Sequence, residues 1–145
     1  MSDPQIQLCL VLHNHQPVGN FDGVFEDAYQ DSYLPFLNVF EKFVDLSISL
    51  HTSGPLMQWL QTNHPDYLNR IAQLVEAGRI EIIGGAFYEP ILPMIPRRDR
   101  VGQITRFTKW LNERVCSSVN GMWMPERVWE SCLTESLADS NIQYT

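Results

Sequence analysis

The chain has 145 residues, a length that suits one domain with its own hydrophobic core and is short for two. Hydrophobic residues make up 44% and charged residues 19%, which is the balance of a globular protein rather than a disordered one. Seventeen acidic residues against ten basic ones give a net charge of −7, which argues against binding to nucleic acid or to an anionic membrane. The sequence has no apolar run of the roughly 20 residues that span a bilayer, and no basic region precedes an apolar one at the start. We therefore expect a cytoplasmic protein.

Three cysteines, Cys9, Cys116 and Cys132, have neither the spacing of a disulfide framework nor a Cys-x-x-Cys pair. Each lies among apolar residues, so we expect reduced and buried thiols rather than catalytic ones.

Short apolar runs alternate along the chain with longer helical patterns. A buried strand is predicted over 6–12, and further strands over 46–51, 79–84, 121–124 and 141–145. Between them, a helix or two interrupted at Pro35 is predicted over 26–44, and a second helix begins near Pro65 and stops at Gly78. A third helix follows Pro96. This alternation predicts an α/β fold with a parallel sheet of about five strands.

In a parallel sheet, functional residues collect in the loops after the carboxyl ends of the strands. After the first strand come His13 and His15, two residues apart, so both imidazoles point to one face. Such a pair suits metal ligation or recognition of a polar substrate, or it is a pair of hydrogen-bonded loop histidines. After the second strand, His51 is either a site residue or a packed histidine in a segment that caps the next helix.

The third and fourth strand ends carry carboxylates beside aromatic rings. Two glycines precede the run Ala-Phe-Tyr-Glu that ends at Glu89, a pattern that suits a sugar site or a glycine-rich turn with aromatic packing. Trp123 and Trp129 bracket Glu126 and Arg127. A nearby guanidinium would keep Glu126 ionised, as a nucleophile needs, although a structural salt bridge is the alternative.

Three of these segments, in this order and spacing, resemble the first three motifs of glycoside hydrolase family 57, the family of α-amylases and 4-α-glucanotransferases. They are HNHQPVGNF at 13–21, GAFYEPIL at 85–92 and GMWMPERVW at 121–129, and the likeness also takes in HTSGPL at 51–56. The resemblance covers essentially the whole chain. It implies an incomplete (β/α)7 barrel of the glycoside hydrolase/deacetylase type, of which residues 1–145 form a single N-terminal portion.

The resemblance also implies retaining chemistry on α-glucans or maltooligosaccharides, with no cofactor and no metal. Glu126 corresponds to the family's nucleophile. The substrate-binding positions implied or suggested by the strand ends are His13, His15, Gln16, His51, Glu89, Trp123 and Trp129. A retaining glycosidase needs a second, protonated carboxyl group about 5–5.5 Å from the nucleophile.

In the family this acid/base is an aspartate in a fourth motif, and the sequence ends before any such segment. We therefore expect the chain to be inactive alone, as a truncated product or as one part of a split enzyme that a companion chain completes. Replacement of the aspartate by Glu89 is a weaker possibility. Three alternatives stay open: a non-catalytic α-glucan-binding module, a metal-dependent polysaccharide deacetylase or mannosidase, and a gene fragment without function.

Overall fold

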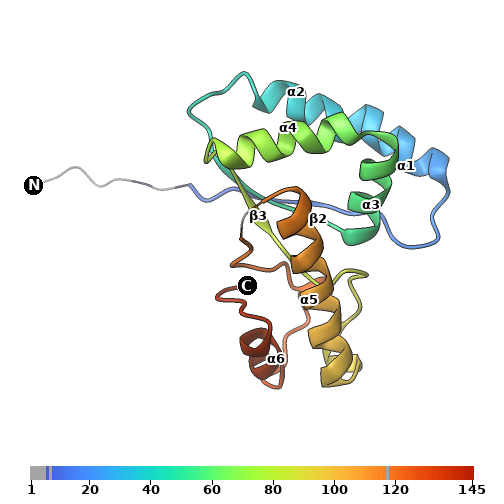
Figure 1. Cartoon of the computed structure of the whole chain (residues 1–145), viewed down its shortest axis with the longest axis vertical. Helices are drawn as coiled ribbons and strands as arrows, with labels where there is room; N and C mark the ends of the chain where they lie inside the picture. The colour runs from blue at the N-terminus through green and yellow to red at the C-terminus, as the bar shows by residue number, and fades with distance from the viewer. Residues whose placement is uncertain (1–5, 7, 117) are drawn as a thin grey trace, which may run out of the picture.

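The computed structural model describes residue 6 and residues 8–116 and 118–145. Its centre is a parallel sheet of three strands in the order β1 (Val11–Asn14), β2 (Ile48–Thr52) and β3 (Ile80–Ile83). Helices connect these strands, as parallel pairing requires (Figure 1). The register places His13 beside His51, and His51 beside Ile83. The predicted α/β fold with a parallel sheet is confirmed.

The two faces of the sheet differ in burial. Leu12, Leu50 and Ile82 are neighbours across the strands and pack into the main hydrophobic core beneath the helices. The next residues in the register, Ser49 and Glu81, lie on the opposite face, where Glu81 is exposed. This alternation follows from the two-residue period of a strand. It leaves the second face open around Glu81, whereas His51 and Ile83, farther along the same face, are buried.

The fourth and fifth predicted strands, at 121–124 and 141–145, form only isolated parallel bridges. Gly84 pairs with Met122, and Gly121 pairs with Tyr144. These pairings continue the sheet in the predicted order, but the described residues form three strands and not five. Each of these two pairings is made by only one or two backbone hydrogen bonds, which is too few for a regular ladder.

The first predicted strand, at 6–12, is also corrected. β1 begins at Val11 and runs on to Asn14, and the described residues before it are exposed, with Ile6 and Leu8 at 96% and 81% exposure. Residue 7 lies outside the described residues. In the described part of the chain, no strand pairs with the segment before Leu10, so its apolar side chains are not covered.

The predicted helix over 26–44 begins earlier and ends earlier than expected. It comprises α1 (Asp22–Ala28), a π-helical turn η1 (Tyr29–Tyr33) and α2 (Leu34–Phe40). Pro35 does not interrupt it. The amide of Leu34 bonds to the carbonyl of Tyr29, five residues back, so the π turn accommodates the residue that lacks an N–H.

The remaining helices are α3 (Gly54–Asn63), α4 (Pro65–Glu76), α5 (Arg97–Arg114) and α6 (Leu133–Asp139), with short 3-10 turns η2 (Leu92–Met94) and η3 (Pro125–Arg127). The helices predicted to begin near Pro65 and after Pro96 are confirmed as α4 and α5. Pro65 is the first residue of α4, and Gly78 follows its end with a φ of 70°. Figure 1 shows α1 to α4 gathered at one end of the sheet, and α5 and α6 toward the other.

Two clusters of apolar side chains form the core. The larger joins the strands to α1–α5, and the smaller lies around α5 and α6, where Ile104 and Leu133 are buried. The three cysteines are free, as predicted, but they are not buried: Cys9 and Cys132 are exposed and Cys116 is half-buried. Cys9 lies in the uncovered segment before β1, and Cys132 lies at the surface directly before the short helix α6, without a capping hydrogen bond from its side chain. No described helix combines the length and the apolar character that crossing a bilayer requires.

Candidate active site

Residues from separate strand ends line one cavity of about 280 Å³. They come from β1 and the loop after it, from the loop after β3, and from the segment after the Gly84–Met122 bridge. The lining residues are His13, His15, Pro17, Val18, Tyr88, Glu89, Trp123, Pro125 and Glu126. Five of the eight residues singled out from the sequence therefore share a cavity, as expected where parallel strands end at one edge of a sheet.

Three aromatic rings stack at the base of this cavity. The imidazole of His13 lies nearly parallel to the Trp123 ring, with ring centroids 4.3 Å apart and an angle of 10°. On the neighbouring strand, His51 is fully buried and its Nδ1 lies 2.8 Å from Nδ1 of His13. In this hydrogen bond one Nδ1 donates its proton and the other accepts it. At least one of the two rings therefore has no proton on Nδ1 and is neutral.

Burial lowers the pKa of both histidines of this pair. For His51 the pKa falls well below its usual value because the ring is out of water, and the nearby His13 and His15 lower it further. For His13 the pKa is lowered first by burial and then by His15, while the negative charge of Glu126 acts in the opposite direction. At neutral pH the His13–His51 pair is therefore uncharged, and the buried His51 can fix the orientation of the His13 ring.

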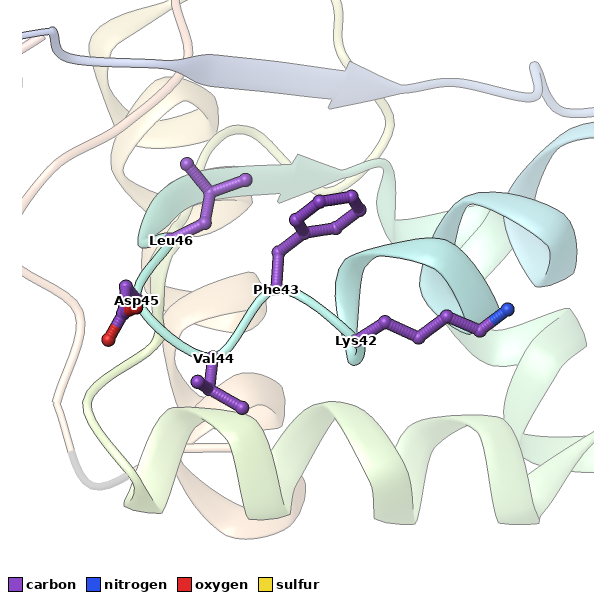
Figure 2. Close-up of a pocket in the computed structure, with 5 residues that line it drawn as sticks. All are labelled: Lys42, Phe43, Val44, Asp45 and Leu46. Atoms are coloured by element: carbon purple, nitrogen blue, oxygen red, sulfur yellow. The ribbon is translucent and has the colours of Figure 1, made fainter.

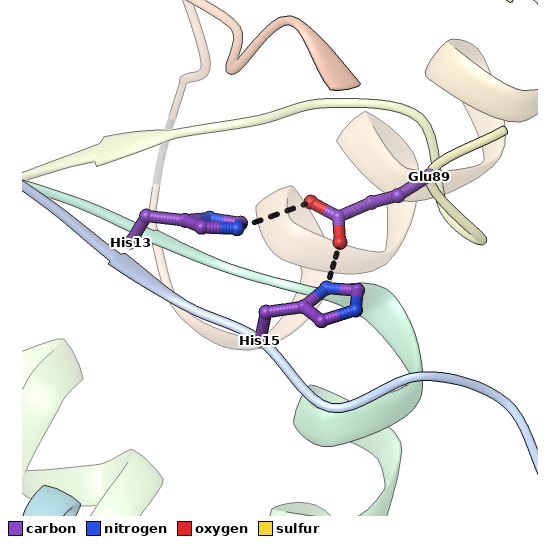
Figure 3. A group of neighbouring side chains, drawn as sticks. All are labelled: His13, His15 and Glu89. Carbon is purple, nitrogen blue, oxygen red and sulfur yellow. Dashed lines mark ion pairs between the residues drawn. The ribbon is translucent and has the colours of Figure 1, made fainter. Parts of the chain in front are cut away.

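Glu89 extends from the loop after β3 toward the two histidines of the first motif (Figure 3). Its side chain is 7% exposed, one carboxylate oxygen pairs with Nδ1 of His15, and the other lies 4.0 Å from Nε2 of His13. Burial raises the pKa of Glu89, His15 lowers it, and the charge of Glu126 raises it. Three groups from two strand ends thus converge on one point.

The backbone is strained at both carboxylates. Glu89 has a φ of 51°, and Glu126 and Arg127 have φ values of 53° and 56°, in the left-handed region that residues other than glycine rarely adopt. Such outliers concentrate at functional sites, where the surrounding structure holds them. Glu126 is exposed in the cavity wall. Among the described residues no ion pair joins Glu126 to Arg127, and Arg127 lines a different cavity. The structural salt bridge that was the alternative role for Glu126 is therefore not formed with Arg127.

Three predicted site residues do not line the cavity. His51 lies behind His13, in contact with it rather than with the open space. The backbone amide of Gln16 donates to Ser53 Oγ, and its side chain bonds to Tyr33 and Asn20, so Gln16 ties the first motif to its neighbours. Trp129 is 49% exposed and outside the cavity wall.

The glycine pair before Glu89 permits close packing at two points. A Cβ on Gly84 would lie 2.7 Å from Val119 Cγ1, and a Cβ on Gly85 would lie 2.9 Å from His51 Nε2. The loop that follows is held by α5, where Gln103 accepts a hydrogen bond from the amide of Tyr88 and Arg106 lies over the Phe87 ring. Sequence reasoning missed Gln103 and Arg106, since polar residues on a helix give no signal of a long-range role.

A second cavity, of about 420 Å³, is lined by residues 42–46 in the connection from α2 to β2 (Figure 2). Phe43 and Val44 are 59% and 71% exposed there. None of the predicted site residues borders this cavity, and the loop supplies only one cation and one carboxylate. The groups suited to chemistry lie in the cavity beside Glu89.

A comparison with protein families identifies a model that matches residues 9–145, described as glycosyl hydrolase family 57. The chain belongs to this family. The family that the order and spacing of the three motifs indicated is therefore confirmed. Residues from all three motifs line the cavity described above.

The most similar relatives include α-amylase 1 of Dictyoglomus thermophilum, 47% identical over 139 residues, and a 4-α-glucanotransferase of Thermococcus litoralis, 41% identical over 140 residues. These alignments take in 96% and 97% of this chain but only 20% and 21% of the relatives. The crystal structure of the Thermococcus litoralis enzyme superposes with a TM-score of 0.89 over 92% of this chain and 21% of that one. The chain thus spans about a fifth of the length of these relatives.

A more distant likeness concerns the fold alone. A peptidoglycan deacetylase of Bacillus subtilis superposes with a TM-score of 0.61 at 11% identity, over 94% of this chain and 56% of that one. The Thermococcus litoralis enzyme and the deacetylase thus both resemble this chain in the arrangement of strands and helices. Only the former also resembles it in sequence, with 41% identity against 11%.

Proposed function

We propose that the chain is the N-terminal portion of a retaining α-glucan-active glycoside hydrolase or 4-α-glucanotransferase, with Glu126 as its nucleophile. The observation that supports this most directly is the single cavity that Glu126 shares with Glu89, Trp123 and the two histidines of the first motif. The relatives named α-amylase and 4-α-glucanotransferase support an α-glucan or a maltooligosaccharide as the substrate class.

Each group in the cavity then has a separate task. The exposed Glu126 attacks the anomeric carbon of a glucose unit and forms a covalent glycosyl-enzyme. Trp123 offers an apolar ring to the C–H face of the sugar, and its stacking on His13 holds that ring in place. His13, His15 and Glu89 supply donors and acceptors for the sugar hydroxyls.

The acid/base is the missing part of this machinery. Glu89 is committed to an ion pair with His15, and its buried position suits binding better than repeated proton transfer to a leaving group. We expect the 145-residue chain to bind glucan but to turn it over negligibly. Robust hydrolysis or transfer of maltoheptaose by the purified chain would contradict this expectation.

A companion polypeptide, or a continuation of this one, would complete the site. Another cavity, apolar and of about 390 Å³, borders the sheet, with Val11, Ile83, Met122 and Tyr144 among its lining residues. In a closed barrel this side of the sheet is covered by the remaining strands, which would also bring the acid/base. Between hydrolysis and transfer, the choice depends on whether water or a sugar hydroxyl reaches the glycosyl-enzyme.

The nucleophile can be tested without the acid/base. In 5-fluoro-α-glucosyl fluoride the fluoride leaves without protonation, so attack by a Glu126 oxygen forms the C–O bond as the C–F bond breaks. Mass spectrometry of the labelled peptide should find the sugar on Glu126, and no label in Glu126→Gln. Trp129→Ala, which alters a residue outside the cavity, serves as the matched control and should still be labelled.

Calorimetry with maltoheptaose separates catalysis from simple binding. Trp123→Ala should weaken binding roughly two- to tenfold, since stacking on an aromatic ring contributes about 0.5–1.5 kcal/mol. Binding that survives in wild type while Glu126 stays unlabelled would favour the alternative of a non-catalytic α-glucan-binding module. Loss of both would contradict both functions and favour a fragment without activity.

A further inference from the structure

The hydrogen bond between His13 and His51 has two possible directions, and they place the ring protons differently. The two Nδ1 atoms lie 2.8 Å apart, and burial lowers the pKa of both rings, so at neutral pH each ring has one N–H group. In the first arrangement His51 donates from Nδ1, and His13 carries its own proton on Nε2. In the second arrangement His13 donates from Nδ1, and His51 carries its own proton on Nε2.

The surroundings of His51 Nε2 favour the first arrangement. The His51 ring is fully buried, and its Nε2 has no hydrogen-bond partner in the described part of the chain. The segment at Gly85 packs against this nitrogen, since a Cβ at Gly85 would lie 2.9 Å from it. A proton on Nε2 would therefore be a buried donor without an acceptor, which is costly and rarer in proteins than an unpaired acceptor. The first arrangement avoids that donor because it places the His51 proton on Nδ1.

The position of Glu89 favours the same arrangement independently. Its buried Oε1 lies 4.0 Å from His13 Nε2 and 3.7 Å from His51 Nδ1 (Figure 3). At such distances a carboxylate oxygen attracts an N–H group and repels the lone pair of a bare ring nitrogen. In the first arrangement both nitrogens that face Oε1 carry protons, and in the second neither does. Two different neighbours thus place the protons on the same two nitrogens.

We infer that His51 is a positioning residue: it donates from Nδ1 to His13 Nδ1 and thereby keeps the proton of His13 on Nε2. His13 then offers a donor, and no acceptor, to a ligand in the cavity that it lines. The same bond holds the His13 ring against a half-turn, and Trp123 holds its plane. The consequence for glucan rests on the proposed function. A sugar oxygen accepts a hydrogen bond from His13, whereas the ionised Glu89 can only accept one from a sugar hydroxyl.

Nitrogen NMR of the intact chain measures the tautomers without any ligand or substitution. Protonated and bare nitrogens of a neutral imidazole have well-separated shifts, and the chain has only four histidines. At neutral pH, Nδ1 of His51 and Nε2 of His13 should both give the shift of a protonated nitrogen. The other nitrogen of each ring should give the shift of a bare one. The reverse pattern, or averaged shifts on both rings, would overturn the inference.

Two variants test whether His51 sets the tautomer of His13. His51→Leu removes the donor at similar volume, whereas His51→Asn keeps an amide nitrogen as many bonds from the backbone as Nδ1. The shifts of His13 should become those of a tautomer mixture in His51→Leu and should stay as in wild type in His51→Asn. Maltoheptaose affinity should fall about two- to tenfold in His51→Leu, the effect of one misdirected neutral hydrogen bond, and should recover in His51→Asn. A merely structural role would weaken both variants alike and would leave the His13 shifts unchanged.

His64 provides the matched control. Its Nε2 lies 2.8 Å from Glu26 Oε2, outside the cavity, so His64→Ala should leave the shifts of His13 and His51 and the glucan affinity unchanged. Urea unfolding shows whether each variant is folded, and the wild-type shifts decide the tautomers even if a His51 variant does not fold. If wild type has the expected tautomers but binds no maltoheptaose, the proposed function fails and the inference about His51 stands. If wild type binds maltoheptaose and His51→Leu changes neither the His13 shifts nor the affinity, the positioning role is refuted and glucan binding stands.

Discussion

Gly54, the first residue of α3, should be irreplaceable because of what it touches. A Cβ at this position would overlap the backbone oxygen of Phe87 and would lie 2.8 Å from both Cδ1 and Cγ of its ring. Phe87 is fully buried, packs edge-on against Phe107 at 5.5 Å, and has Arg106 over its face. Neither the ring nor the helix can move freely, so Gly54→Ala forces one of them out of place.

The magnitude follows from two opposing effects. Overpacking a full core costs about 1–3 kcal/mol, while alanine in place of glycine in a helix gains at most about 1 kcal/mol, and less at the first turn. We expect Gly54→Ala to lower the free energy of unfolding by about 1–2 kcal/mol. Gly102, inside α5, is the matched control because its Cβ would meet nothing within 4 Å. Gly102→Ala should raise the free energy of unfolding by about 0.5–1 kcal/mol.

Urea unfolding of the two variants and wild type, followed by circular dichroism, measures both changes. The same samples test the site, because Phe87 lies two residues before Glu89 and a displaced loop would move the carboxylate away from His15. Maltoheptaose binding should therefore weaken in Gly54→Ala and stay unchanged in Gly102→Ala. If Gly54→Ala and Gly102→Ala change the free energy of unfolding in the same direction and by the same amount, the contact with α3 does not hold the Phe87–Glu89 loop in place. The prediction for Gly54 is then refuted.

Three further predictions concern the scaffold. The Arg70 guanidinium, which hydrogen-bonds to Glu41, lowers the pKa of the Glu41 carboxyl. The pair therefore stabilises the fold at pH values above the ordinary carboxyl pKa. This stabilisation is lost as the pH falls through the lowered pKa of Glu41. Because both groups are about a third exposed, Glu41→Gln should cost less than about 1 kcal/mol at pH 7, and unfolding curves on acidification should converge with wild type. Arg79→Ala removes hydrogen bonds to carbonyls at the end of α2 and should cost about 1–3 kcal/mol, with faster hydrogen exchange there. Phe107→Ala should cost about 3–5 kcal/mol in a urea titration, and equal stability would contradict the packing described.

The convergence of the site was predictable from the sequence. His13 and His15 follow one strand, Glu89 and Glu126 follow others, and parallel strands bring their carboxyl ends to one edge. What each side chain contacts there was not predictable. Arg127 follows Glu126 in the chain, yet two successive left-handed residues send it to a different cavity. Where the backbone leaves regular secondary structure, two residues adjacent in sequence can have side chains that point in different directions.

The contacts of His51 could likewise not be predicted from the sequence. The sequence favoured helix capping as the role of the segment that begins at His51, with His51 itself either packed or in contact with substrate. The structure buries it completely and joins it to His13 through a hydrogen bond across 38 positions of sequence. Gly85, whose missing side chain makes room for the His51 ring, comes from a third segment. Three distant positions decide this contact together.

The sequence by itself determined the helix between Pro65 and Gly78, the start of the helix after Pro96 and the motif order, because apolar periodicity, proline and glycine act over a few neighbouring residues. It also determined the parallel sheet, through the alternation of strand and helix. Only the tertiary structure decided how far each strand extends. A strand exists where a partner offers hydrogen bonds, so 121–124 and 141–145 form single bridges while β2, paired on both sides, forms a full strand. The tertiary structure likewise decided which polar atoms meet at Glu89, because such contacts depend on segments that local patterns cannot position.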